Sequence, residues 1–423
     1  MTHAESLAHA DFFRHCFAFG AVIGAEMPTG PDVFYTVALD TTHRKLYCSC
    51  PFFPKPCMHS EALSLLFRKE GAAFFPETAD APVWLDTLLS GKPASATHTH
   101  DDPEKRAARQ EKTRFERLER ARGGFDDLEA WLNDTVRRGL ATVVSEEPGA
   151  FEQLATRAAD ASMTGLSRAI RLLAHIPASS PDWSVLVTDV LAQIYLAVRA
   201  FRNREALPEA LLHDLQNFIG INLKKEDVLA SGERLTDTWA VMGDVVEPLE
   251  DRLQARRTWL LGADSGRMAL LLDFSFGGAD FPPGFATGSM QHGTLVFYPS
   301  AYPQRALVQE DFHALPQTMD AMPGVPDITV FLEKYATALA AQPWLPYFAE
   351  AISEVTVQRA STGRFFMSDR LGKILPLHAT EQFGWSLVAL GGGHPLDVFG
   401  EWNSRTFQPL SAVADGRIVR LAQ

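Results

Sequence analysis

The stretch that decides the fold near the N-terminus reads Cys48-Ser49-Cys50-Pro51-Phe52-Phe53-Pro54-Lys55-Pro56-Cys57-Met58-His59. It holds three of the four cysteines of the chain, together with a histidine. Zinc favours four ligands at tetrahedral corners, and thiolate with imidazole is the common set in structural sites. We therefore expect Cys48, Cys50, Cys57 and His59 to bind one structural Zn2+ ion.

The spacing of these ligands predicts their local structure. Side chains two residues apart on a strand share a face, so Cys48 and Cys50 can converge at the end of a strand. Two residues advance about 200° around a helix, so Cys57 must precede a helix whose first turn carries His59. The prolines of 51–56 restrict the unfolded chain and lower the entropic cost of closing the site. Four protein ligands leave no open position for a substrate, which predicts a structural rather than a catalytic ion.

The sequence on either side of the cysteines completes a small ββα unit. Residues 34–39 and 45–48 are rich in β-branched and aromatic side chains and predict a hairpin. Apolar residues recur at helical spacing over 60–70, and Gly71 provides the stop. The fourth cysteine, Cys16, lies in an apolar run, and we expect it to be a small buried hydrophobic side chain.

This pattern of Cys-x-Cys, a short spacer and Cys-x-His resembles that of SWIM zinc fingers. The resemblance covers about residues 33–70, including the hairpin and the helix that begins Ser60-Glu61-Ala62-Leu63. Residues 257–262 and 270–274 are also similar to a bacterial subset of SWIM proteins of about this length.

The resemblance implies zinc binding and a role with a partner. Proteins of this subset are commonly encoded beside MoxR-type AAA ATPases and von Willebrand A-domain proteins. SWIM fingers in general are regarded as modules that bind DNA or protein.

A chain of 423 residues is too long for one compact core and predicts several domains. We expect a SWIM-type finger module over 1–90, a charged linker or helix over 91–124, a helical domain over 125–254 and an α+β domain over 255–423. The charged segment ends in the pair Gly123-Gly124, which predicts a break. The fold class is therefore α+β and multidomain.

Periodicity predicts the elements of the last two domains. Apolar residues at helical spacing begin at Phe125, Leu166 and Leu186, and 328–341 also predicts a helix. Asp264-Ser265-Gly266 predicts a hairpin turn. The segments that predict strands are 258–261, 268–276, 294–298, 365–367, 385–390, 396–399 and 418–421. We expect Gly391–Gly393 to form a turn between two of these strands.

Composition limits the location and the partners of the chain. The net charge is −13 and the pI about 5.5, so the chain as a whole repels phosphate backbones. The N-terminus shows no secretory signal. Asp189 and Gln193 interrupt the longest apolar stretch, 185–200, so we expect no membrane span and a cytoplasmic location.

The leading hypothesis is a non-catalytic interaction or scaffold protein that binds a protein partner. The alternative is nucleic-acid binding through the finger. Residues 1–90 hold six Lys or Arg against ten Asp or Glu, which disfavours DNA. The DNA hypothesis rests on a basic cluster and two aromatic side chains able to stack on bases: Arg44, Lys45, Lys55, Phe52 and Phe53.

A second alternative is an enzyme within 255–423. Asp273, His292, His313 and Asp327 could form a hydrolytic set, but their spacing matches no catalytic pattern. A deep pocket with convergent polar groups would favour this hypothesis. The alternating histidines of 97–102 could form a second metal site, although a solvated polar linker explains them better.

Overall fold

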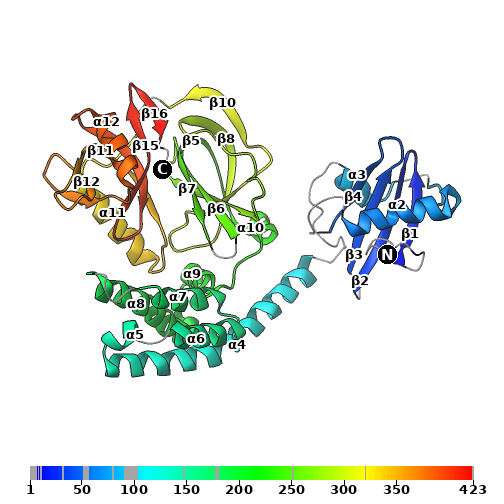
Figure 1. Ribbon diagram of the computed structural model, residues 1–423, viewed down its shortest axis with the longest axis horizontal. Coiled ribbons are helices and arrows are strands. Elements are labelled where there is room, and N and C mark those ends of the chain that lie inside the picture. The colour runs from blue at the N-terminus through cyan, green and yellow to red at the C-terminus, as the bar shows by residue number, and fades with distance from the viewer. Residues whose placement is uncertain are drawn as a thin grey trace. The chain divides into compact units, whose positions relative to one another are not determined.

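The computed structural model describes residues 7, 9, 12–30, 33–50, 57–78, 81–89, 103–145, 148–176, 181–249, 252–319 and 321–421. The chain divides into two compact units, Met1–Glu111 and Lys112–Gln423 (Figure 1). The proline loop 51–56 and the histidines of 97–102 lie outside the described residues. The expected α+β class is confirmed, with a helical middle region followed by two sheets.

A four-stranded antiparallel sheet in the order β1-β2-β3-β4 forms the body of the first unit. Its strands are β1 (Arg14–Phe19), β2 (Val22–Gly30), β3 (Val33–Asp40) and β4 (Lys45–Cys48). Its helices are α2 (Met58–Glu70), η2 (Ala72–Phe74) and α3 (Val83–Leu89). The expected β3–β4 hairpin and helix α2 are confirmed, whereas the sequence analysis missed β1 and β2.

The core of this unit lies between the sheet and α2. Ile23, Ala25 and Met27 alternate along β2 and are all buried, a period-two pattern that marks a half-buried strand. Leu63 and Leu66 bring the helix onto the same core. Cys16 packs against this core but is half-buried, so it is less buried than the expected small buried hydrophobic side chain. Its burial raises the pKa of its thiol.

The second unit begins within helix α4, at Lys112, and a group of helices forms its first part. They are α4 (Pro103–Arg138), α5 (Ala141–Ser145), α6 (Pro148–Asp160), α7 (Thr164–Ala174), α8 (Trp183–Arg202), η3 (Arg204–Ala206), α9 (Glu209–Ile219) and α10 (Lys225–Ser231). Strand β5 begins at Glu233, so the expectation of helix up to residue 254 was wrong for its last part.

Gly123 and Gly124 lie inside α4 and do not end it, contrary to expectation. A Cβ at Gly124 would lie 2.3 Å from the Cε atom of Met163 and 2.7 Å from the Cβ atom of Ala161. The chain leading into α7 thus passes close to α4 at this glycine, so Gly124 serves packing rather than termination.

Helix α8 is long and apolar enough by composition to cross a membrane, although it contains Asp189 and Gln193. One face of it is buried in the helical core through Val187, Leu191, Ile194 and Val198. A core helix of a globular domain has this same composition, and the burial of that face accounts for it here.

Two six-stranded sheets form the rest of the second unit (Figure 1). The first has the order β10-β8-β5-β6-β7, with β9 also paired to β8. Its strands are β5 (Glu233–Pro248), β6 (Leu253–Gly262), β7 (Met268–Phe276), β8 (Ser289–Phe297), β9 (Ala306–Val308) and β10 (His313–Thr318). The hairpin predicted around Asp264-Ser265-Gly266 is confirmed as β6–β7.

The second sheet has the order β13-β12-β11-β14-β15-β16. Its strands are β11 (Phe348–Arg359), β12 (Phe365–Ser368), β13 (Ile374–Pro376), β14 (Leu396–Trp402), β15 (Phe407–Ala414) and β16 (Arg417–Arg420). Helices α11 (Ile328–Ala341) and α12 (Glu381–Gly391) pack against β11. The prediction of a helix over 328–341 is confirmed.

The prediction of a strand over 385–390 was wrong, because these residues belong to α12. The side chain of Thr380 accepts a hydrogen bond from Phe383 N, and Gly392 ends the helix in the left-handed conformation. Phe383 and Leu387, four residues apart, are buried on one face. The glycine run 391–393 therefore joins a helix to a strand.

Candidate metal centre

The four predicted ligands come from the end of a strand and the start of a helix. Cys48 is the last residue of β4 and pairs with Val37 on β3. Cys57 is the residue that precedes α2, in an extended conformation with φ −87° and ψ 166°, and His59 lies in the first helical turn. This is the arrangement that the spacing predicts.

The ligand atoms converge on one point. All four lie within 4.8 Å of one another, and all four residues are buried. The Sγ atoms of Cys50 and Cys57 are 3.3 Å apart, and Nδ1 of His59 lies 3.8 Å from Sγ of Cys57. Tetrahedral zinc with Zn–S bonds of about 2.3 Å separates its sulfur ligands by about 3.8 Å. The cluster can therefore hold one metal ion of this size.

Hydrogen bonds around the ligands fix their positions. The backbone N–H of Cys50 donates to Sγ of Cys48 at 3.4 Å. The Ser60 hydroxyl donates to the carbonyl oxygen of Cys57 at 3.0 Å and lies 3.6 Å from its Sγ atom. Such outer contacts orient the first ligands and tune the metal affinity of a site.

The sequence analysis missed three residues that support the cluster. Ser49 joins β3 through two hydrogen bonds to Thr36, with its N–H donating at 3.0 Å and its hydroxyl accepting at 2.9 Å. The ring of Tyr35 lies 5.0 Å from that of His59. The serine between the first two cysteines was the available signal, because its side chain must point away from the ligands to the opposite face.

The thiols differ in acidity. A hydrogen bond with Cys48 lowers the pKa of the Cys57 thiol to about 3, and the same interaction raises the pKa of Cys48 above its ordinary value. Metal binding requires thiolates, so it releases protons from these thiols and tightens as the pH rises.

Two of the basic residues named for the DNA hypothesis, Arg44 and Lys45, are exposed at the β3–β4 turn. Two residues of β4 separate Lys45 from Cys48, which places the two Cα atoms about 10 Å apart along the strand. Phe52, Phe53 and Lys55 fall outside the described residues.

The four residues considered for a hydrolytic site make contacts with different parts of the second unit. Asp273 binds Arg256 at 2.6 Å, and Asp327 caps α11 by accepting from Val330 N at 2.9 Å. His292 and His313 face each other across β8 and β10, with ring centroids 5.7 Å apart. The two aspartates are thus engaged in structural contacts.

Residues 116–219 match the family model of the SWIM-associated four-helix bundle domain. The matched range includes most of α4 and continues through α9. It lies outside the cysteine cluster, so it supports membership of the SWIM family independently of the Cys-x-Cys and Cys-x-His pattern. No curated protein matches the chain.

Proposed function

We propose that the chain is a SWIM-type zinc protein that acts as a non-catalytic interaction or scaffold protein in the cytoplasm. The N-terminal unit is its metal-held docking module. One observation carries the proposal: three cysteines and a histidine, all buried, converge within 4.8 Å. Four protein ligands complete a tetrahedral shell, so a zinc ion there has no free position for a substrate or an activated water molecule.

Cys48, Cys50, Cys57 and His59 would hold the ion. It would join the end of β4 to the start of α2, and so hold the sheet to the helix that packs on the unit core. In small zinc domains the metal contributes about 10–16 kcal/mol of apparent binding free energy, which is also folding free energy. The ion would therefore keep the outer face of this unit rigid enough to recognise a partner.

The charges of this unit favour a protein partner over DNA. Two of its described basic residues, Arg44 and Lys45, lie at the β3–β4 turn close to Asp40. A third, Lys69, lies 3.9 Å from Glu70. Phosphate contacts supply most of the affinity of non-specific DNA binding, and nearby carboxylates weaken them. The partner that the SWIM resemblance implies is a MoxR-type AAA ATPase or a von Willebrand A-domain protein.

The test is affinity capture from native extract with three forms of the full chain: wild type, Cys57→Ser and Cys16→Ser. Cys16 is the cysteine outside the metal cluster, so its variant is a matched control. We expect wild type and Cys16→Ser to retain the same ATPase or A-domain protein, identified by mass spectrometry, and Cys57→Ser to lose it.

A mobility-shift assay on duplex DNA separates the two hypotheses. Binding by wild type that weakens steeply with salt and disappears in Cys57→Ser would replace the protein hypothesis with the DNA hypothesis. Capture of the partner by Cys57→Ser as efficiently as by wild type would show that the finger is not the docking module.

A further inference from the structure

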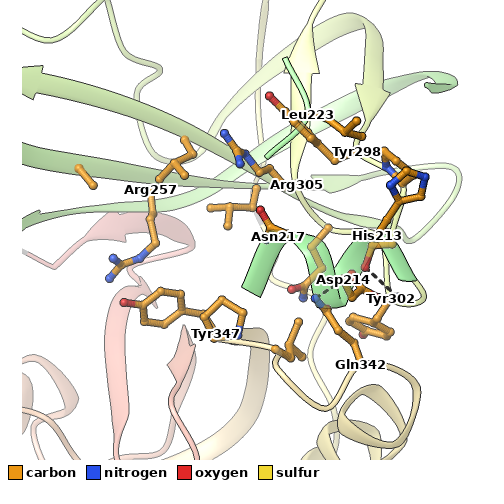
Figure 2. Close-up of a pocket in the computed structure, with 18 of the residues that line it drawn as sticks. His213, Asp214, Asn217, Leu223, Arg257, Tyr298, Tyr302, Arg305, Gln342 and Tyr347 are labelled. Carbon is orange, nitrogen blue, oxygen red and sulfur yellow. Dashed lines mark hydrogen bonds between the residues drawn. The ribbon is translucent and has the colours of Figure 1, made fainter. Parts of the chain in front are cut away.

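A cavity of about 300 Å³ lies within the second unit, away from the metal cluster. Its walls come from α9, from β5–β7 and from the segments 298–305 and 342–347. Figure 2 shows Arg257 and Tyr347 on one side of this cavity and His213 and Tyr298 on the other. The volume falls at the lower end of the range for small-molecule sites.

Much of the lining is apolar. Leu270, Leu272 and Phe274 follow one another at every second position of β7, so they share the face of the sheet that borders the cavity. Leu345 and Pro346 line it from the segment before β11. These walls can bury the hydrocarbon body of a ligand.

The carboxylates at the cavity are already engaged. Asp214 accepts a hydrogen bond from Ala301 N at 2.8 Å. It also accepts one from Gln342 Nε2 at 3.0 Å (Figure 2). Glu247 accepts from the Tyr347 hydroxyl at 3.0 Å and from Arg257. Both acids therefore serve the protein itself and offer little to a ligand.

Arg305 and its neighbour Gln304 carry side-chain donors that form no hydrogen bond with the described residues. Gln304 is 6% exposed, and its Nε2 atom is buried without a hydrogen-bond partner in the described part of the chain. Arg305 is half-buried with its guanidinium 4.2 Å from the ring centroid of Tyr298, and no described carboxylate forms an ion pair with it. Buried donors are rarely left unsatisfied, because water no longer compensates them.

We propose that this cavity binds a small organic carboxylate with an apolar body. The guanidinium of Arg305 donates hydrogen bonds and carries a positive charge, so a ligand with acceptor oxygens and a negative charge fits it. Its planar shape also matches the geometry of a carboxylate. The leucines of β7 and Leu345 cover the rest of the molecule.

Isothermal titration of the full chain tests this with benzoate, phenylacetate and phenylbutyrate, each compared with its primary amide. Each amide has nearly the shape of its acid but carries no negative charge. We expect at least one acid to bind about tenfold or more tightly than its amide. Equal affinity of every acid and its amide, or no heat from any acid at millimolar concentration, would overturn the proposal.

Substitutions test whether the acid binds in this cavity. Arg305→Met should weaken the acid about tenfold or more, whereas Arg417→Met, at an exposed position on β16, should leave it unchanged. Wild-type affinity in Arg305→Met would place the acid elsewhere and contradict the proposal.

Discussion

Cys57 connects the metal cluster to the helix that follows it. Its Sγ atom lies in the cluster, and its carbonyl oxygen accepts the N–H of Glu61 at 3.0 Å, the first hydrogen bond of α2. The same residue therefore fixes a metal ligand and the start of a helix. A change at this position affects both the site and the local fold.

Cys57→Ser is expected to release zinc and to unfold residues 33–70, because ligand loss and unfolding are coupled in a small metal site. Loss of an outer-shell partner weakens metal binding about 10- to 100-fold, and loss of a ligand should exceed that range. Zinc content after dialysis, measured by atomic emission, checks the prediction. Cys16→Ser is the control and should retain its zinc; equal zinc in all three proteins would refute the ligand assignment.

Glu401 neutralises a buried arginine between the two sheets of the second unit. Glu401 is 2% exposed. Its carboxylate accepts hydrogen bonds from Arg257 Nε at 2.8 Å, from Arg257 Nη2 at 2.9 Å and from Trp259 Nε1 at 2.6 Å. Arg257 belongs to β6 and Glu401 to β14, so the pair ties one sheet to the other.

Glu401→Gln is expected to lower the free energy of unfolding by about 3 kcal/mol, because it leaves Arg257 buried with a weaker charge partner. Urea unfolding followed by tryptophan fluorescence measures the loss. Glu354→Gln removes an exposed carboxylate 3.8 Å from Arg370 and should cost less than about 1 kcal/mol. A similar small loss in both variants would show that Glu401 is not needed to neutralise Arg257.

At the scale of elements, helix α4 shows that a pair of glycines, which usually ends a helix, can lie inside one for reasons of packing. Two successive glycines would ordinarily end a helix, yet α4 runs through them to Arg138. Gly123 is exposed, and a Cβ there would meet nothing within 4 Å, whereas Gly124 faces Ala161 and Met163. The two glycines therefore have opposite roles.

Gly123→Ala is expected to stabilise the second unit by about 0.5–1 kcal/mol, because alanine loses less backbone freedom in a helix. Gly124→Ala should destabilise it by about 1–3 kcal/mol, since the added methyl group overlaps neighbouring side chains. Thermal unfolding of the two variants measures the opposite signs. Equal shifts in both would contradict the close approach seen at Gly124.

At the scale of the whole molecule, the metal cluster lies in one compact unit and the cavity in the other. The first unit has a core built on β1–β4 and α2. The second unit has separate cores, one among its helices and others on its two sheets. A unit with its own core can lose its structure while the other keeps it.

Removal of zinc with a chelator is therefore expected to unfold the first unit alone. Hydrogen exchange should lose its protection over 33–50 and 57–70, where the cluster joins β4 to α2. Protection over 233–276 should stay unchanged. Loss of protection in this second range would mean that the ion also stabilises the second unit.

The sequence by itself determined the features that depend on near neighbours. The convergence of Cys48, Cys50, Cys57 and His59 follows from residue spacing. The β3–β4 hairpin, α2, α11 and the β6–β7 hairpin follow from apolar period and turn residues. Each is set by side chains within a few turns or strands of one another. Local patterns suffice where the interacting residues are close in the chain.

Only the tertiary structure decided the features that join distant segments. An apolar run at 385–390 suits a strand or a helix, and its caps and packing on β11 made it α12. Arg257 and Glu401 are 144 residues apart, and Gln304 Nε2 is buried without a hydrogen-bond partner among the described residues. Burial decides the role of such polar groups, and burial follows from long-range packing that local sequence does not encode.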